Sequence, residues 1–81
     1  MWQEGVFEID GTGLKYFAKV FDEGSKFGIN GGRISKLEII KDTGTRSYIN
    51  DPIVMYDRGW EVKPRNSLGK KALEYVLGLF K

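Results

Sequence analysis

The sequence contains no cysteine and no histidine, and only two prolines among its 81 residues. Without cysteine the chain can form neither a disulfide framework nor a thiolate metal site. Without histidine it also lacks the commonest general base and the commonest metal ligand. These absences leave only Asp, Glu, Lys, Tyr and Ser for catalysis, and no stretch places them at the spacing of a known catalytic motif. We therefore expect a non-enzymatic protein with no cofactor and no metal.

Long apolar runs and a strong net charge are missing as well. No apolar stretch approaches the roughly 20 residues that a membrane-spanning helix needs. The N-terminus, Met-Trp-Gln-Glu-Gly, lacks the basic start and apolar core of a signal peptide. Thirteen Lys and Arg against eleven Asp and Glu give a net charge of +2, too little for a committed nucleic-acid binder. We expect one cytoplasmic domain over residues 1–81, with no membrane segment.

Two segments at the start of the chain have the composition of paired strands. Residues 2–9 place Phe7 and Ile9 on one face, and residues 14–21 alternate with Leu14, Tyr16, Ala18 and Val20 on one face. Asp10-Gly11-Thr12-Gly13 between them is typical of a hairpin turn. Because Phe17 and Phe21 add apolar groups to the second face, residues 14–21 predict a central strand, covered by a helix on one side and partly covered on the other.

The middle of the chain predicts further strands. Residues 34–41 form the third, and Asp42-Thr43-Gly44 provides a turn, after which residues 45–50 run back. Pro52 has no N–H to donate to a ladder. It therefore separates segments 46–50 and 53–58, which form either one bulged strand or two short ones. Gly59 and Trp60 end this strand, with Glu61-Val62 as an extension before Pro64.

The hydrophobic period changes from two to 3.6 after Asn66. Asn66 or Ser67 can cap a helix, and apolar residues then recur at helical spacing through Leu68, Ala72, Tyr75, Val76, Leu79 and Phe80. Such a helix of about three and a half turns needs a sheet to dock on. The fold class is therefore α+β: an antiparallel sheet of four or five strands with one C-terminal amphipathic helix on a face.

The segment from Lys26 to Leu37 is unusually rich in glycine. Gly28-Ile29-Asn30-Gly31-Gly32-Arg33 could cradle a phosphate through backbone amides, with Arg33 as the charged clamp. A strand follows it, however, and not the helix N-terminus that known phosphate loops use. The structural alternative is a loop packed on its own sheet, with Arg33 paired to Asp22, Glu23 or Asp57.

Three other groups of residues have both functional and structural interpretations. Tyr56-Asp57-Arg58-Gly59-Trp60 contains the residue types enriched in protein-binding hot spots, and is equally typical of a strand end at which Trp60 covers the core. A basic corner of Lys63, Arg65, Lys70 and Lys71 could contact nucleic-acid phosphates but is more typical of a solvated helix face. Asp42-Thr43-Gly44 spells the aspartic-protease tripeptide, but that chemistry needs paired carboxylates, and a turn explains the motif.

Two sequence blocks and the strand that precedes them carry a resemblance to a known family. The chain from Tyr16 to Asp22, the block Phe27–Leu37 and the block Tyr56–Trp60 resemble a family of small proteins from bacteriophages, prophages and Gram-positive bacteria, catalogued as a domain of unknown function. The resemblance covers nearly the whole chain, and the connection between Asp42 and Pro52 is longer than expected for the family. It implies a phage or mobile-element setting in a bacterial host and assigns no catalytic residue.

The first functional hypothesis is a small phage or prophage accessory protein that binds a host or phage protein, for example as a counter-defence or regulatory factor. A homo-oligomer through an exposed edge strand is also expected. The alternatives are a protein that sequesters a phosphate-bearing nucleotide through the glycine-rich loop, and an accessory protein that binds nucleic acid at the basic corner. The predicted ligand or partner residues are Phe27, Asn30, Gly31, Gly32, Arg33, Tyr56, Asp57, Arg58 and Trp60.

Overall fold

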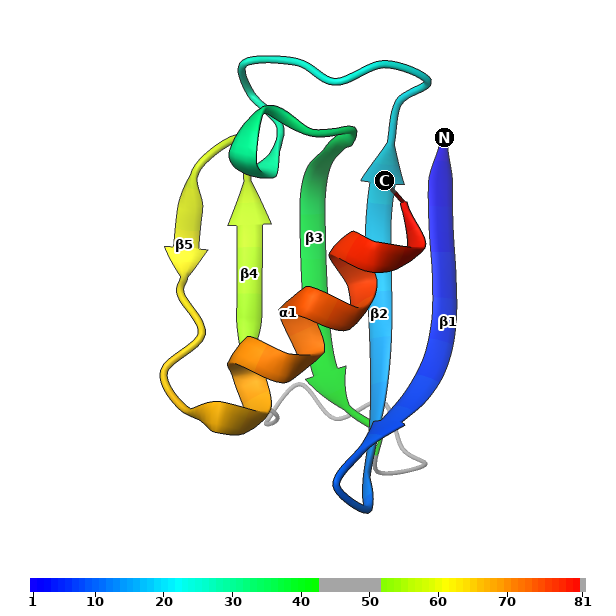
Figure 1. The fold of residues 1–81 in the computed structure, drawn as a ribbon, viewed down its shortest axis with the longest axis vertical. Coiled ribbons are helices and arrows are strands. Elements are labelled where there is room, and N and C mark those ends of the chain that lie inside the picture. Colours follow the sequence, from blue (N-terminus) through cyan, green and yellow to red (C-terminus); the bar gives the residue numbers. More distant parts are fainter. Residues whose placement is uncertain (43–51, 81) are drawn as a thin grey trace.

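The computed structural model describes residues 1–42 and 52–80. Its elements are β1 (Trp2–Ile9), β2 (Thr12–Val20), the short 3-10 turn η1 (Ile29–Gly31), β3 (Ile34–Lys41), β4 (Val54–Asp57), β5 (Trp60–Val62) and α1 (Ser67–Leu79) (Figure 1). The five strands form one open sheet in chain order, and each pairs antiparallel with its neighbours. The α+β class with a C-terminal helix is therefore confirmed.

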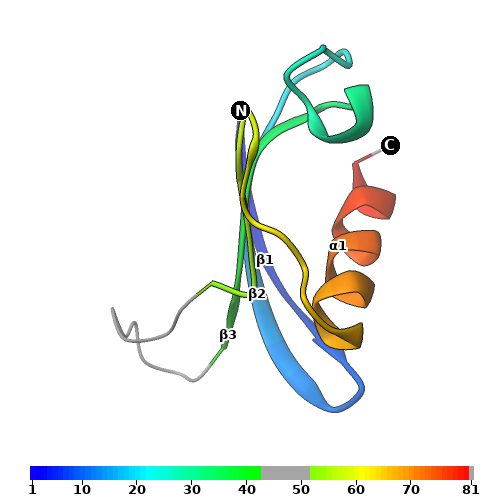
Figure 2. The same cartoon turned by 90° about the vertical axis from the view of Figure 1, so that its left-hand side faces the viewer.

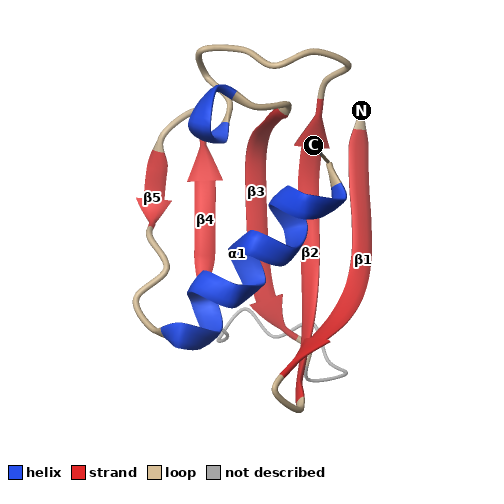
Figure 3. Cartoon of the chain, in the orientation of Figure 1, coloured by secondary structure: helices blue, strands red, loops and turns tan. Residues whose placement is uncertain are grey.

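Helix α1 covers one face of the sheet. Seen from the side, all of α1 lies on that face (Figure 2), and seen from the front it runs obliquely from the β4 side towards β1 (Figure 3). The alternation within the strands explains this arrangement, because Leu14, Ala18 and Ile39 point to the helix and are fully buried. Ala72 and Val76 of α1 pack against them and are also fully buried.

Aromatic contacts fasten the C-terminal half of α1 to the first two strands. Tyr75 stacks on Phe7 of β1 with ring centroids 4.6 Å apart, and Phe80 meets Tyr16 of β2 edge-on at 5.9 Å. Such pairs contribute about 0.5–1.5 kcal/mol beyond the burial of their area. They hold a helix that contains two glycines and would be marginal in isolation.

The helix begins where the sequence predicts. Asn66 has extended backbone angles, and its Oδ1 accepts a hydrogen bond of 2.9 Å from the amide of Gly69. This bond satisfies one of the N–H groups that the first helical turn leaves without a partner. The predicted cap is therefore confirmed.

The chain around Trp60 differs from the prediction. Trp60 does not end a strand; it begins β5, after a tight reversal in which Arg58 adopts a φ of 55°. The second short strand of this region is therefore Trp60–Val62, and segment 45–50 lies outside the described residues, as do Thr43 and Gly44 of the predicted turn. The second strand runs over Thr12–Val20, slightly earlier than the predicted 14–21.

The described residues contain no helix that is both long enough and apolar enough to cross a membrane.

Candidate functional site

The glycine-rich loop between β2 and β3 is compact and packed against itself. Ile29 inserts into the core, while Asn30 and Gly31 take positive φ angles of 55° and 71°. Gly28 lies so close to Gly32 that a Cβ on Gly28 would collide with the carbonyl oxygen of Gly32. Backbone geometry therefore explains the glycine content of this loop without any ligand.

The loop also uses several of its own amides. Gly28 donates to the carbonyl of Ser25 at 3.0 Å, Gly31 to that of Gly28 at 3.1 Å, and Gly32 to that of Ile29 at 2.9 Å. A phosphate cradled by these amides would have to replace the internal hydrogen bonds. The geometry gives the loop a structural role as a rigid support, and any ligand contact from its backbone would require rearrangement.

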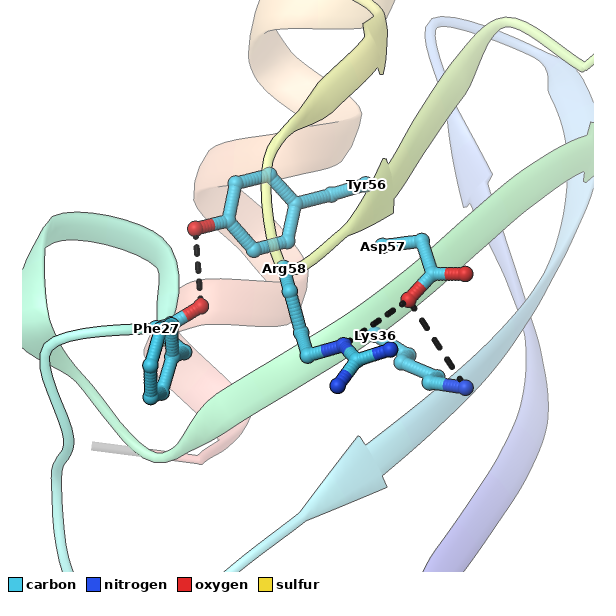
Figure 4. Close-up of polar contacts among 5 residues, drawn as sticks. All are labelled: Phe27, Lys36, Tyr56, Asp57 and Arg58. Carbon is cyan, nitrogen blue, oxygen red and sulfur yellow. Dashed lines mark hydrogen bonds and ion pairs between the residues drawn. The ribbon is translucent and has the colours of Figure 1, made fainter.

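A side-chain hydrogen bond joins the glycine-rich loop to β4. The hydroxyl of Tyr56 on β4 donates to the carbonyl oxygen of Phe27 in the loop at 2.9 Å (Figure 4). Trp60 packs edge-on against the Tyr56 ring, with centroids 5.0 Å apart. Phe27 and Trp60 nevertheless remain 51% and 37% exposed, and Arg58 is exposed beside them. We call these three residues, Phe27, Arg58 and Trp60, the loop–hairpin surface.

A cationic hollow of about 270 Å³ lies beside this surface. Lys19, Lys36 and Arg58 line it, together with Phe21, Ser25, Phe27 and Ser35. Asp57 reaches both Lys36 and Arg58, with N–O distances of 3.7 Å, whereas Lys19 forms no ion pair among the described residues and lies over the Phe21 ring. Asp57 thus pairs with two of the three cations, which leaves the hollow with excess positive charge.

The strand register brings two of these cations together. Lys19 of β2 stands directly opposite Lys36 of β3, on the face of the sheet away from α1. Like charges in this position repel each other and destabilise a sheet. The sequence pattern places Phe21 on the second face of its strand but does not predict the hollow, because the register that sets Lys36 against Lys19 is not visible in either strand alone.

The predicted site residues divide between two places. Phe27, Tyr56, Asp57, Arg58 and Trp60 gather around the hydrogen bond just described. Asn30, Gly32 and Arg33 line a separate hollow of about 550 Å³ between the loop and the end of α1, where Glu74, Leu77 and Phe80 complete the wall. Gly31 is exposed in the loop.

Arg33 has a bracing role in this arrangement. Its Nε donates a 2.8 Å hydrogen bond to the carbonyl oxygen of Phe21, and its own carbonyl accepts from the Phe21 amide at 2.9 Å. The side chain therefore ties the two ends of the loop together. Asp57 pairs with its neighbour Arg58, at an N–O distance of 3.7 Å.

The basic corner is not a single cluster. Lys71 turns to the β1–β2 turn, where its Nζ lies 2.7 Å from Oδ2 of Asp10. Arg65 lines a small hollow with Pro52, Ile53 and Val62, while Lys63 and Lys70 are exposed. The corner therefore offers less positive charge than its sequence indicates.

Among the described residues, no three acidic side chains lie close enough to hold a metal ion.

Comparison with known proteins identifies one family. The sequence profile of a family described as a domain of unknown function (DUF7678) matches residues 1–81. No curated protein and no solved structure matches the chain.

Proposed function

The chain belongs to the DUF7678 family, and we propose that it is a non-enzymatic protein that works by binding a partner protein with an acidic surface. The contact region is the loop–hairpin surface together with the cationic hollow beside it. The observation that carries the proposal is that the exposed Phe27 ring lines a hollow with three cations, of which Asp57 pairs with two, while Trp60 is exposed nearby on the Tyr56 ring.

The composition of this region is that of a protein contact. Trp and Arg are over-represented among residues that dominate binding energy, and exposed aromatic rings supply much area at low entropic cost. The Tyr56–Phe27 hydrogen bond and the internal bonds of the loop fix the backbone that carries Phe27, and the edge contact with Tyr56 orients the Trp60 ring before a partner arrives. Less conformational freedom is then lost on binding.

The backbone of Arg58 supports a binding role for this residue. A non-glycine residue with a φ of 55° is held in a conformation that costs free energy, about 1–3 kcal/mol for sparsely populated regions. Glycine adopts positive φ angles readily, so a glycine at position 58 would form this turn at a lower cost in free energy than arginine does. An arginine at this position is therefore explained better by its guanidinium than by the turn.

The excess positive charge defines the partner. Carboxylates on a partner would offset the repulsion between Lys19 and Lys36. They would add negative charge to that of Asp57. In the phage or prophage setting that the sequence resemblance implies, the partner is a host protein such as an immune or regulatory factor. Sequestration of a nucleotide by the loop amides is less favoured, because those of Gly28, Gly31 and Gly32 already donate within the loop.

The test compares what the protein captures from a lysate of a bacterial host. Wild type, Arg58→Gly and Trp60→Ala are immobilised, with Lys70→Ala on α1 as the matched surface control. We expect an acidic protein that wild type and Lys70→Ala retain and that both site variants lose. The purified partner should then bind wild type in calorimetry, with an affinity that falls as salt rises.

Two results would contradict the proposal. One is a captured set that is the same for wild type and for both folded site variants. The other is a rise in the melting temperature of wild type with a nucleotide panel, which would indicate the nucleotide alternative. Binding of short nucleic acids at low salt that Lys63→Ala and Lys70→Ala weaken would instead favour the basic corner.

A further inference from the structure

Strand β1 forms a long edge of the sheet. Among the described residues it pairs with β2 alone and is eight residues long, whereas the opposite edge strand, β5, has three residues. Figure 1 shows the two strands at opposite sides of the sheet. An edge of this length presents a row of backbone groups that can pair with another strand.

The hydrogen bonds at the start of β1 show which backbone groups point outward. Met1 and Val20 exchange two bonds, of 3.0 Å and 2.8 Å, and the register then continues without a shift to Ile9 opposite Thr12. Since bonded and non-bonded pairs alternate in an antiparallel ladder, odd-numbered residues of β1 bond to β2. The N–H and C=O groups of the even-numbered residues therefore point away from the sheet: Trp2, Glu4, Val6 and Glu8.

Most of the devices that usually protect such an edge are absent from β1. The strand contains no proline, no lysine and no bulge, and its charged residues are Glu4 and Glu8. Apolar side chains also gather along it: Trp2 and Val6 are 60% and 66% exposed on the open face. On the helix face, Tyr75 stacks on Phe7 and is exposed, and exposed Leu79 lies one helical turn further on the same side.

We propose that β1 pairs antiparallel with β1 of a second copy of this chain, across a twofold axis that passes beside Gly5. In this register all four outward-pointing residues form hydrogen-bonded pairs. Trp2 faces Glu8 of the second copy, Glu4 faces its Val6, and the two Gly5 residues face each other. The two sheets join into one continuous sheet, with both helices on the same face.

Repulsion between glutamates of the two copies favours this register over the adjacent registers. Only even-numbered residues point outward, so alternative registers shift by two residues. One shift sets Glu4 against Glu4 of the second copy, and the other sets Glu4 against its Glu8. Both oppose carboxylates directly and pair only three outward-pointing residues, so they lose hydrogen bonds and gain repulsion.

The proposed dimer also covers exposed apolar groups and leaves the loop–hairpin surface free. Trp2 and Val6 would lie against the open face of the joined sheet, while Tyr75 and Leu79 would meet the second copy beside the helix. The loop–hairpin surface includes Trp60 of β5 at the far edge of the sheet. The dimer would therefore display two such surfaces, and it stands independently of the proposed function.

The first experiment measures the mass of the intact chain by sedimentation equilibrium over a range of concentrations. Wild type is expected at twice the 9.2 kDa chain mass. Val6→Glu should give a folded monomer, because it sets a second carboxylate opposite Glu4 of the second copy, while within the chain position 6 faces Lys15. Val6→Thr keeps a β-branched side chain, adds no charge and should stay a dimer. A monomeric wild type, or a Val6→Glu variant that dimerises as tightly as wild type, would overturn the proposal.

The second experiment tests the register and does not depend on a dissociating variant. Because the chain has no cysteine, Glu4→Cys and Val6→Cys can each be introduced alone and then mixed under oxidation. The proposed register sets these positions opposite each other, about 5.5 Å apart between Cα atoms, which a disulfide can span. The mixture should form a cross-linked heterodimer in large excess over either homodimer. Efficient cross-linking of either variant with itself would overturn the register.

Discussion

The hydroxyl of Tyr56 and the carbonyl oxygen of Phe27 are joined by a 2.9 Å hydrogen bond, although the two residues are 29 positions apart in the chain. Tyr56 stands on β4 with its ring almost completely buried, and Phe27 lies in the glycine-rich loop. The bond therefore holds the loop against the end of β4. It also places the exposed Phe27 ring next to Arg58 in the wall of the cationic hollow.

Removing this hydrogen bond should loosen the loop without unfolding the protein. We expect Tyr56→Phe to lower the free energy of unfolding by about 1 kcal/mol, a typical net value for one hydrogen bond. Hydrogen exchange of amides in residues 25–32 should become faster. The control is Tyr75→Phe, which keeps its ring stacked on Phe7. Equal exchange rates in wild type and Tyr56→Phe would show that this bond does not hold the loop.

Two glycine substitutions should differ sharply in their effect on the free energy of unfolding. Gly28→Ala forces a Cβ into the carbonyl of Gly32, so the loop backbone must shift, and we expect a loss of about 1–3 kcal/mol in the free energy of unfolding. Gly59→Ala meets open space and no positive φ, so its stability should match wild type or slightly exceed it. Urea denaturation of both variants measures the difference. Similar stabilities would contradict the tight packing of the loop.

The repulsion between Lys19 and Lys36 should be measurable as stability. Lys19→Glu places opposite charges across β2 and β3, and we expect the free energy of unfolding to rise by a few tenths of a kcal/mol to about 1 kcal/mol. The gain should shrink at high salt. Lys15→Glu is the control, because Lys15 faces Val6 and Ile40 and no lysine. A decrease in stability at low salt would count against the repulsion.

The cap of α1 offers a test of the helix start. Asn66→Ala removes the acceptor for the Gly69 amide and should lower the free energy of unfolding by about 1 kcal/mol. Asn66→Asp keeps an oxygen acceptor and should retain most of the wild-type stability. Thermal unfolding followed by circular dichroism compares the two. Equal losses in both variants would indicate that the side-chain oxygen does not cap the helix.

Much of the fold could be predicted because its signals are local. The alternation of Leu14, Tyr16 and Ala18 predicts one buried strand face, and these residues do point to the helix. Asn66 combines an N-cap side chain with a change of hydrophobic period, and the helix begins beside it. The reversal at Arg58 was missed, because the positive φ falls on the arginine and not on the neighbouring Gly59.

The candidate site was only partly predictable. Phe27 and the Tyr56–Trp60 block were singled out for their residue types, and a hydrogen bond does join them. Arg33, singled out with them, instead ties Phe21 to the end of the loop and lines a different hollow with Glu74. Lys36 was not singled out, because one lysine on the polar face of a strand carries no signal of its own.

The sequence by itself determined the class of fold, the order of strands and helix, and the glycine-rich loop, since each depends on residues close together in the chain. Only the tertiary structure decided which side chains of that loop meet β4 and which meet α1. The register of β2 against β3 set Lys19 opposite Lys36, and the chain order of the strands left β1 at an edge. Both are properties of strand pairing between distant segments, and pairing depends on how the whole core packs.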